Sequence, residues 1–446
     1  MFSRDIQREL NEWKNSSRRK PLLLRGARQV GKTTVVNEFG RTFDNYLYFN
    51  LERDEQKALF ESRMSLDSLV DQMFLFHRRI RKTGTTLIFI DEIQNSVIAM
   101  SLLRYFYEEH PELYVIAAGS LLENVVDVNH SFPVGRVQYL PMRPCSFREF
   151  ICAIGKDNLL TMAMEESMAP VVHDELMTLF NRYLLVGGMP AAVEAYAESG
   201  DVLAQDDIYE TLLQSYRDDA EKYVRGGKLT DVVRFVLLQG WSSAGEIISL
   251  GGFAGSDYKS REVGEAFRLL EKAMLLELVY PATNTEIPLM PEIKRQPKLI
   301  WLDTGLVNYA VGVRNEIIEA KDILDVWKGR IAEHVVAQEL LTLNNKIGQR
   351  RQFWTKGNGG ESAEVDFMWT VDSILIPIEV KAGRNSHLRS LHSFIDASSS
   401  SVALRVWSGP LSVDEVKTTI KKKPFKLINL PFYLVGNMET IIRKVL

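Results

Sequence analysis

The first 140 residues alternate short runs of apolar or β-branched residues with longer amphipathic stretches. This alternation is typical of parallel strands joined by crossover helices, because strands buried on both faces appear in a sequence as short apolar runs. The predicted strands cover residues 21–25, 46–51, 86–91, 113–119 and 137–140. The pattern therefore predicts an α/β fold with a parallel sheet at the start of the chain.

The spacing of apolar residues changes after residue 145. It then follows a helical period, interrupted by Gly187, Gly188 and Pro190, which disfavour helix continuation, so we expect a helical lid domain. Two helices, a polar Gly/Ser turn, a third helix and short strands come next, and this order fits a winged helix-turn-helix.

A mixed α/β pattern resumes in the last part of the chain. A helix is predicted over 327–341, followed by strands over 351–355, 363–370 and 373–380. The patterns together predict four domains, in the order sheet, lid, winged helix and final α/β domain, over residues 1–145, 146–226, 227–310 and 311–446.

Composition agrees with a multidomain soluble protein. The 446 residues are about three times the usual domain length, and 46% apolar with 25% charged residues exclude a disordered or collagen-like chain. A net charge of −4 gives no overall attraction to nucleic acid, so such binding must rest on local basic surface. Cys145 and Cys152 lack the spacing of a zinc site and are interpreted as ordinary thiols. No apolar leader or run of about 18 apolar residues occurs, so we expect a cytoplasmic protein without a membrane anchor.

The firmest motif lies directly after the first predicted strand and opens a helix. Its pattern, Gly26-x4-Gly31-Lys32-Thr33, is that of a loop whose backbone N–H groups wrap a phosphate. Lys32 is expected to reach the β and γ phosphates, and Thr33 to offer its hydroxyl to magnesium. The sequence therefore predicts binding of ATP with Mg2+ by the residues Gly26, Ala27, Arg28, Gln29, Val30, Gly31, Lys32, Thr33 and Thr34.

A second acidic motif follows the apolar residues 87–90. Asp91 and Glu92 come at the carboxyl end of that strand, where parallel α/β sheets place their sites. Asp91 would hold magnesium with Thr33, and Glu92 could polarise the attacking water. An alternative is that the two acids only cap the following helix.

Two further candidates come from the order of the strands. Ser120 ends the next strand and could sense the γ-phosphate, although serine at a strand end is also common turn chemistry. Arg136 precedes the fifth strand and could reach the γ-phosphate of a neighbouring subunit and neutralise its charge during transfer, or could be an ordinary surface arginine.

Several of these motifs together resemble ATP-binding proteins of the AAA superfamily, on the branch close to archaeal ATPases and STAND-type switches. The resemblance covers nearly the whole chain and rests on segments 24–34, 89–94, 118–120, 135–150, 183–190 and 303–306. It implies a P-loop NTPase core of the AAA type, an arginine-finger role for Arg136, and lid residues Gly188 and Pro190 near the adenine. From the residues alone, Gly187 to Pro190 is only a helix breaker.

The predicted third helix of the winged domain offers a candidate DNA contact. Lys259 and Arg261 lie near its N-terminus, the end that meets DNA in helix-turn-helix proteins. Three acids in the same helix, Glu262, Glu265 and Glu271, dilute this basic charge. A protein-contact role for this domain is the alternative.

The last domain carries an ordered set of acids and a lysine. Glu333 lies in the predicted helix, Asp366 in a strand, and Glu379 and Lys381 on one face of the next strand. Asp366 and Glu379 could hold magnesium, with Glu333 completing the metal shell and Lys381 activating water against a phosphodiester. The set resembles the PD-(D/E)XK core, which implies a restriction-endonuclease-like domain that either cleaves or only binds. The alternative is that these acids and the lysine form exposed ion pairs, which contribute little to stability and have no functional role.

Two functions fit these motifs. The first is a magnesium-dependent ATPase acting on DNA, with a nuclease-like C-terminal domain. The second is an ATP-dependent switch that oligomerises or recruits a protein partner, with little turnover and no nuclease activity. ATP, DNA and further copies of the chain are the expected partners.

Overall fold

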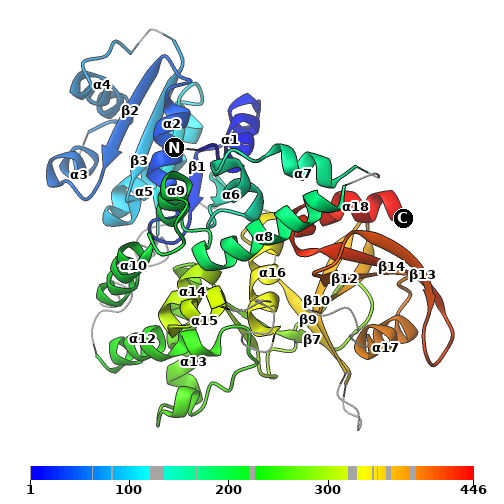
Figure 1. Cartoon of the computed structure of the whole chain (residues 1–446). Helices are drawn as coiled ribbons and strands as arrows, with labels where there is room; N and C mark the ends of the chain where they lie inside the picture. Colours follow the sequence, from blue (N-terminus) through cyan, green and yellow to red (C-terminus); the bar gives the residue numbers. More distant parts are fainter. Residues whose placement is uncertain are drawn as a thin grey trace.

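The computed structural model of the chain describes most of its residues. The described ranges are 2–62, 64–81, 84–120, 135–165, 169–219, 227–319, 329–343, 346–348, 350–357, 363–381 and 388–446. Figure 1 shows two sheets, with the first in the N-terminal part of the chain and the second in the C-terminal part, and helices between them.

The N-terminal sheet is entirely parallel, with the strand order β2-β3-β4-β1-β5. Its strands lie within a residue or two of the predicted ones: β1 (Leu22–Arg25), β2 (Asn45–Asn50), β3 (Thr86–Asp91), β4 (Tyr114–Gly119) and β5 (Gln138–Pro141). β4 lies between β1 and β3, so the phosphate-loop strand and the acidic-motif strand are separated by the strand that Ser120 follows. All their carboxyl ends meet at one edge, where a site is expected.

Helices cover both faces of this sheet. Side chains of α1 (Ile6–Asn15) and α2 (Lys32–Gly40) share a core with Leu22 and Leu24 on one face. The helices of the other face pack against Leu23 and are α3 (Asp54–Glu61), α4 (Leu66–Phe76) and α5 (Val97–Glu109). The alternation of Leu22, Leu23 and Leu24 between two cores explains why the first three residues of β1 are all apolar.

The lid region is helical, as the apolar spacing indicates. Its helices are α6 (Phe147–Ala153), α7 (Asn158–Ala163), α8 (Pro170–Val186), α9 (Pro190–Ser199) and α10 (Asp206–Asp218). α8 ends at Gly187, which has φ +65°, and α9 begins with Pro190 in its first turn, where proline is favoured. The glycine and proline motif is therefore the corner between α8 and α9.

The middle region begins with a helix and ends with short strands, as predicted, but the second of the two predicted helices is only the four-residue 3-10 turn Gly240–Ser243. It contains α12 (Lys228–Gln239), the 3-10 turns Gly240–Ser243 and Phe253–Gly255, α13 (Ser260–Lys272), β6 (Leu276–Val279) and β8 (Lys298–Trp301). β6 and β8 pair antiparallel. The winged-helix assignment remains a prediction. Two helices follow, α14 (Thr304–Val311) and α15 (Arg314–Glu319), and α14 is tied to α8 by a bond from Asn308 Nδ2 to the Leu184 carbonyl (2.8 Å).

The C-terminal sheet has the order β13-β14-β12-β11-β10-β9-β7. The predicted strands correspond to β9 (Gln352–Thr355), β10 (Glu364–Val371) and β11 (Ile374–Val380), and they are joined by β12 (Val402–Trp407), β13 (Ser412–Lys417) and β14 (Pro424–Pro431). β11, β12 and β14 run parallel, whereas β10 pairs antiparallel with both β9 and β11, and β13 pairs antiparallel with β14. The edge strand β7 (Pro281–Ala282) comes from the middle region, so this sheet reaches back across the predicted domain border.

Helices cover both faces of the second sheet too. Residues of α17 (Arg389–Ala397) pack on one face with Val365 and Leu375. The other face carries α16 (Arg330–Leu343), the 3-10 segment Phe432–Asn437 and α18 (Met438–Val445). In Figure 1, α16 runs through the middle of the molecule, between the helices of the middle region and the second sheet.

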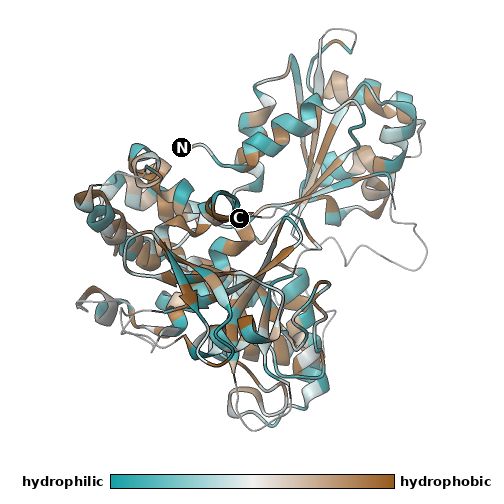
Figure 2. Cartoon of the chain, turned by 90° about the vertical axis from the view of Figure 1, so that its right-hand side faces the viewer, coloured by the Kyte–Doolittle hydropathy of each residue, from teal (hydrophilic) through white to brown (hydrophobic). Residues whose placement is uncertain are grey.

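The cores are distributed as the sequence pattern indicates. Hydrophobic residues concentrate in the strands and on the helix faces turned toward them (Figure 2). Among the helices that the structure describes, none combines the length and the apolar character needed to span a bilayer.

Candidate functional site

The loop between β1 and α2 has the backbone of a phosphate-binding loop. Gly31 has φ +94° and stands directly before α2, so an L side chain there would be strained. Gly26 is fixed by space instead, because a Cβ atom on it would lie 2.6 Å from the Met142 carbonyl oxygen. The two glycines of the motif are thus required for different reasons.

Lys32 is folded back onto the loop. Its Nζ donates to the carbonyls of Gly26 (2.9 Å) and Ala27 (2.8 Å), and only 7% of the residue is exposed. Burial lowers the pKa of Lys32 to about 8, although Glu92 and Asp91 favour its charged form. The ammonium group is therefore held at the loop and partly desolvated, which suits a group that meets phosphate oxygens.

Thr33, Asp91 and Glu92 converge beside the lysine. The hydroxyl of Thr33 donates to Asp91 Oδ2 at 2.7 Å, and burial raises the pKa of Asp91. Glu92 stands at φ +50°, a left-handed conformation, and its carboxylate accepts a hydrogen bond from the Gln94 side chain. A hydroxyl and a carboxylate oxygen in contact at the loop are the hard donors that Mg2+ prefers, so these residues fit the ion.

A cleft of about 480 Å³ opens over the loop. Its walls are the loop, the N-terminal segment with Phe2 and Arg4, Glu92, and the start of α9 with Pro190. The Pro190 Cγ atom lies 3.5 Å from the position of a Cβ on Gly31, so the lid touches the loop. The cleft is large enough for a nucleotide.

The structure places the two lid residues differently. Pro190 lines the cleft, whereas Gly188 is not among its lining residues. The Gly188 N–H donates to Asp303 Oδ2 at 2.5 Å, and a Cβ on Gly188 would lie 2.2 Å from the Cys145 carbonyl oxygen. Gly188 therefore anchors the α8–α9 corner. A contact of either residue with adenine remains a prediction.

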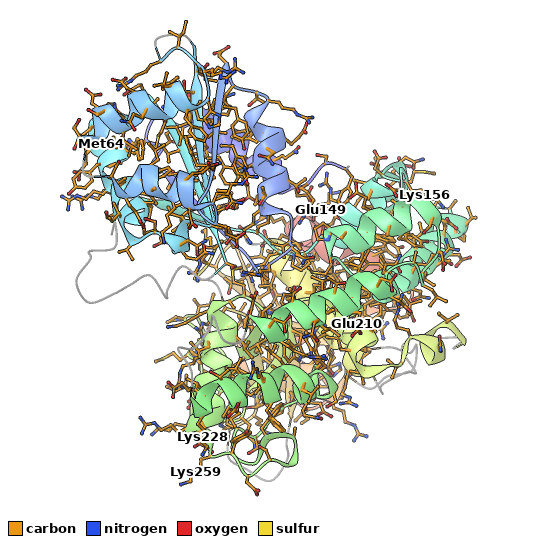
Figure 3. All side chains as sticks on the ribbon, turned by 90° about the vertical axis from the view of Figure 1, so that its left-hand side faces the viewer. Met64, Glu149, Lys156, Glu210, Lys228 and Lys259 are labelled. Atoms are coloured by element: carbon orange, nitrogen blue, oxygen red, sulfur yellow. The ribbon has the colours of Figure 1, made fainter. Side chains whose placement is uncertain are left out.

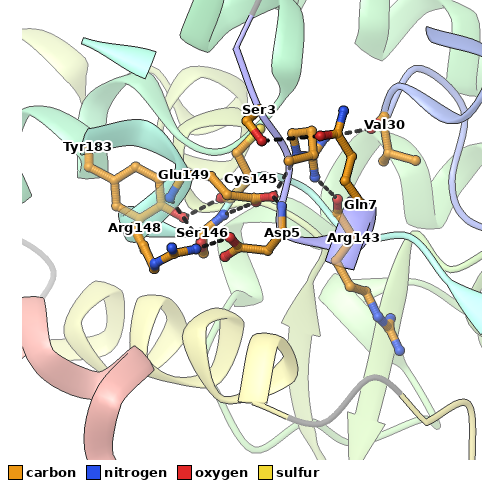
Figure 4. Close-up of polar contacts among 11 residues, drawn as sticks. Ser3, Asp5, Gln7, Val30, Arg143, Cys145, Ser146, Arg148, Glu149 and Tyr183 are labelled. Carbon is orange, nitrogen blue, oxygen red and sulfur yellow. Dashed lines mark hydrogen bonds and ion pairs between the residues drawn. The ribbon is translucent and has the colours of Figure 1, made fainter. Parts of the chain in front are cut away.

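Arg4, which the sequence did not single out, links the loop to the lid, and Figure 4 shows the labelled residues that it contacts, Val30, Arg143 and Glu149. Arg4 is 8% exposed, and its guanidinium donates to the Val30 carbonyl (3.1 Å), the Arg143 carbonyl (2.8 Å) and Glu149 Oε1 (2.8 Å). Glu149 in turn forms a capping box with Ser146 at the start of α6. One buried side chain thus connects the N-terminal segment, the phosphate loop and the lid.

The candidate sensor and arginine finger lie at different depths. Ser120 follows β4 and is buried, and within the described part of the chain its hydroxyl has no hydrogen-bond partner. Arg136 is 45% exposed and donates to Glu108 of α5 at 3.1 Å. Both roles remain predictions.

Asp303 joins the lid corner to the C-terminal half. This buried carboxylate caps α14 through the Leu306 N–H (2.8 Å), accepts from Gly188, and receives Gln338 Nε2 at 3.4 Å. Burial raises the pKa of Asp303 to about 6, while the N–H donors oppose the shift. Sequence inspection found this aspartate only as part of a motif, without a role.

α16 continues the connection toward the first domain. Glu339 Oε1 accepts from the Tyr183 hydroxyl (2.9 Å) and from the Phe147 N–H (3.0 Å) at the start of α6. The amide of Gln338 donates to the same tyrosine at 2.9 Å. α16 is therefore bound to the lid by side chains that are themselves buried.

The four C-terminal candidates lie in one cluster. Lys381 Nζ contacts Glu379 Oε1 at 2.8 Å, and Asp366 Oδ2 accepts the Val380 N–H at 2.7 Å. Glu379 is buried and Glu333 half-buried near Asp366, and desolvation and the charge of Asp366 raise the pKa of both. Residues that the sequence spacing selected thus come together from α16, β10 and the end of β11.

A lysine that the sequence analysis missed stands among these acids. Lys298 of β8 is 3% exposed, and its Nζ lies 3.0 Å from Glu333, 2.7 Å from Glu364 and 3.7 Å from Asp366. Burial alone would lower the pKa of Lys298, but the three carboxylates together outweigh it and raise this pKa. A lysine between apolar residues of a short strand was the available signal, since lysine is almost never fully buried unless it is paired.

The cluster as it stands does not fit a divalent cation. In the described ranges no group of three or more His, Cys, Asp or Glu side chains is arranged to hold a metal. The ammonium of Lys298 takes the central position, and Lys381 occupies one oxygen of Glu379. The other oxygen, Glu379 Oε2, is buried and has no partner among the described residues. We therefore assign no step to a metal at this place.

The basic residues predicted to meet DNA lie at the outer end of α13. Lys259 and Arg261 are exposed there, and Lys228 pairs with Glu262 at 2.5 Å. Figure 3 shows Lys228 and Lys259 together at the end of the molecule remote from Met64, and separated from Glu149 at the loop-lid contact. DNA binding by this surface remains a prediction.

Comparisons with known proteins identify the first domain. Residues 18–151 match the family described as AAA domain, residues 177–317 match a domain of unknown function (DUF8612), and residues 328–432 match another (DUF4143). The second match runs across the lid and the middle region, which we predicted as separate domains. No curated protein matches the chain.

Several solved structures are distantly similar. The Walker-type ATPase Paby2304 of Pyrococcus abyssi has 15% identity and a TM-score of 0.41, over 70% of this chain and 96% of its own. AMPPCP-bound DnaA from Aquifex aeolicus has 13% identity and a TM-score of 0.28, over 60% and 88%. C. elegans PCH-2 has 13% identity and a TM-score of 0.28, over 45% and 63%.

These likenesses are too weak to carry an argument, so the identification rests on the family match together with the parallel sheet and the loop geometry. Residues 18–151 match the AAA domain family and have the parallel sheet and loop of a P-loop ATPase, and the two regions after them match two families of unknown function.

Proposed function

We propose that the protein is a magnesium-dependent ATPase whose nucleotide cycle moves the lid and acts on DNA. The observation that carries the ATPase proposal is the convergence of Lys32, Thr33, Asp91 and Glu92 at one end of a nucleotide-sized cleft. Thr33 and Asp91 would hold the ion, which supplies positive charge to the phosphates when bound.

The residues of the chain have separate tasks in this proposal. Backbone N–H groups of the loop and the start of α2 bind the phosphates, and Lys32 exchanges its bonds to two loop carbonyls for phosphate oxygens. Glu92 accepts the proton of the attacking water, and the bond from Gln94 orients its carboxylate. Ser120 senses the γ-phosphate, and Arg136 acts across a subunit contact.

ATP hydrolysis by the purified full chain tests this proposal. Lys32→Ala should abolish turnover, because the variant loses the cation that binds the β and γ phosphates. Lys57→Ala, at a half-buried lysine on α3 paired with Glu61, is the matched control and should hydrolyse ATP like the wild type. A Lys32→Ala variant with wild-type turnover contradicts the ATPase proposal.

DNA is proposed as partner on the basis of local basic surface, since the net charge of −4 gives no overall attraction. Lys259 and Arg261 support it at the outer end of α13. An electrophoretic shift measured at several salt concentrations tests it, because phosphate contacts must weaken as salt rises. The absence of a shift at low salt contradicts DNA binding and favours the switch described next.

A nucleotide-dependent switch is the second candidate function. The observation that favours it is the tie between the loop and the lid, in which Arg4 binds both Val30 and Glu149. ATP entering beside Arg4 could change the lid position and hence the surface offered to another protein or a second copy. Slow turnover with an ATP-dependent sedimentation change supports the switch, and rapid turnover with unchanged sedimentation contradicts it.

For the C-terminal domain, we propose that the acid cluster does not cleave nucleic acid while Lys298 stays among its carboxylates. The support is the position of its ammonium among Glu333, Glu364 and Asp366. Incubation of plasmid DNA with the protein and Mg2+ tests this. Cleavage by the wild type that disappears in Asp366→Ala and in Lys381→Ala would show a working nuclease and contradict the proposal.

A further inference from the structure

A crevice of about 280 Å³ opens where the first domain, α13 and the segment before β9 meet. It lies apart from the nucleotide cleft, since the two share no lining residue. Five cationic side chains and two carboxylates line it, and the cationic ones are Arg25, Arg143, Arg268, Lys272 and Arg350. No candidate site of the sequence analysis includes these five residues.

The inner part of the crevice is formed by two partly buried arginines on neighbouring strands. Arg25 is the last residue of β1, directly before the phosphate loop, and Arg143 follows β5, which pairs with β1. Arg25 Nη2 donates to the Lys272 carbonyl at 3.3 Å and so connects β1 to the end of α13. The crevice is therefore built on the strand that carries the ATP site.

Arg143 is an unsatisfied cation at this place. Its Nε is buried without a hydrogen-bond partner, and its guanidinium forms no ion pair with any residue that the structure describes. Burial lowers the pKa of Arg143 to about 10; Glu277 opposes this, and Arg351 and Arg25 add to it. An anion beside Arg143 would replace the hydration that burial removes from the guanidinium.

The two carboxylates of the crevice are already engaged. Glu277 Oε2 pairs with Arg351 Nη2 at 2.7 Å, and Glu271 Oε1 accepts the Leu278 N–H at 2.9 Å. Because the carboxylate of Glu277 is paired with Arg351, it balances little of the positive charge of Arg143. The crevice thus has an excess of positive charge.

The rim extends this charge to the surface. Arg268, Lys272 and Arg350 are exposed, the first two on the last turns of α13 and the third just before β9. Phosphate oxygens match the planar guanidinium fork, and several arginines at different depths can bind consecutive phosphates.

We propose that this crevice binds the phosphate backbone of DNA, with Arg143 at its base and Arg268 and Arg350 at its rim. The proposal rests on the DNA part of the proposed function and gives it a location. That location is the opposite end of α13 from Lys259 and Arg261, about 18 Å along the helix. DNA bound there contacts the strand of the phosphate loop directly.

Fluorescence anisotropy with a short labelled DNA duplex, measured over a salt series, tests the proposal. Arg268→Ala combined with Arg350→Ala should weaken binding at least tenfold. It should also lower the slope of log affinity against log salt by about 0.9 for each phosphate that the variant no longer neutralises. Arg41→Ala combined with Lys57→Ala is the matched control, because it makes the same change in charge outside the crevice and away from Lys259 and Arg261, and it should bind DNA like the wild type.

Arg143→Ala should weaken binding as well, and its ATP hydrolysis without DNA shows whether the variant is folded. If Arg143→Ala does not fold, the DNA affinity of the combined Arg268→Ala and Arg350→Ala change, here called the rim variants, still tests the proposal. Equal affinity of the rim variants and the wild type overturns the crevice but leaves DNA as partner. A wild type that binds no DNA at low salt overturns both. Pyrophosphate that binds the wild type but not the rim variants, without any DNA binding, identifies a free-anion site and also overturns the proposal.

Discussion

Replacing Lys298 by methionine should destabilise the protein in a pH-dependent way. Methionine keeps most of the side-chain volume and removes the charge. The variant leaves Glu333, Glu364 and Asp366 without the ammonium that lies 2.7 to 3.7 Å from them. Removal of one partner from a buried ion pair typically costs about 3–5 kcal/mol, and Lys298 is 3% exposed, so we expect about that loss at pH 8.

The sign of the pH dependence follows from the carboxylates. Burial already raises the pKa of Glu333 above the usual 4.5, and loss of Lys298 raises it further. Between pH 4.5 and that raised value, the folded variant binds more protons than the unfolded chain, so its stability falls as pH rises. In the wild type, Lys298 itself stays charged at all these pH values, because its folded pKa lies above its ordinary 10.5, so the pH dependence comes from the carboxylates.

Urea unfolding at pH 5.5 and pH 8 measures the effect. The loss of unfolding free energy in Lys298→Met should be clearly smaller at pH 5.5 than at pH 8, and Lys298→Met combined with Glu333→Gln should recover part of it at pH 8. Lys57→Met, at the α3 lysine, should shift stability by no more than about 0.5 kcal/mol at either pH. If Lys298→Met loses the same unfolding free energy at both pH values, the electrostatic reasoning is refuted and altered packing is the remaining explanation of the loss.

Three further predictions concern the nucleotide site and the lid. Glu92→Gln should keep ATP binding and slow hydrolysis by about 100-fold or more, as measured by nucleotide binding and turnover on one preparation; loss of binding would contradict its role as base. Because burial lowers the pKa of Lys32 to about 8, the nucleotide-free loop loses this charge as pH rises through 8. ATP should then bind more weakly above pH 8 and with proton uptake, which calorimetry in two buffers detects; binding without proton uptake at pH 8.5 would be against this reasoning. Gly188→Ala should cost about 1–3 kcal/mol, since its Cβ would lie 2.2 Å from the Cys145 carbonyl oxygen, whereas Gly264→Ala, with its nearest atom at 3.5 Å, should not destabilise α13; equal effects in thermal unfolding would refute the packing argument.

The parts of the fold that the sequence predicts well are those with local causes. The phosphate loop is recognisable because Gly26 and Gly31 meet steric demands within a few residues of the chain, and Asp91 follows an apolar strand whose register is fixed by burial on both faces. The order of Glu333, Asp366 and Glu379 also pointed to one cluster, because strand alternation and helix position place them on facing surfaces.

The parts that escaped prediction depend on contacts between distant segments. Lys298 lies 35 residues before Glu333 in the sequence, and Arg4 lies 145 residues before Glu149. The spacing of apolar and polar residues within one segment does not predict such pairs, because the two side chains meet only when distant segments pack together. For the same reason the pattern gave no sign that β7 leaves the middle region and joins the second sheet.

The two ends of α16 contact different parts of the molecule. Glu333 faces the acid cluster, and Glu339, about 9 Å further along the same helix, receives the N–H of Phe147 at the lid. An insertion of one residue between them would turn one end by about 100° relative to the other. A recombination that joins a foreign C-terminal domain within α16 would therefore disturb the contacts at one end of the helix. A working chimera of two relatives must therefore take α16 and the lid segment that it binds from the same parent. The helix connects the ATPase domain and its lid to the C-terminal domain and has to match both.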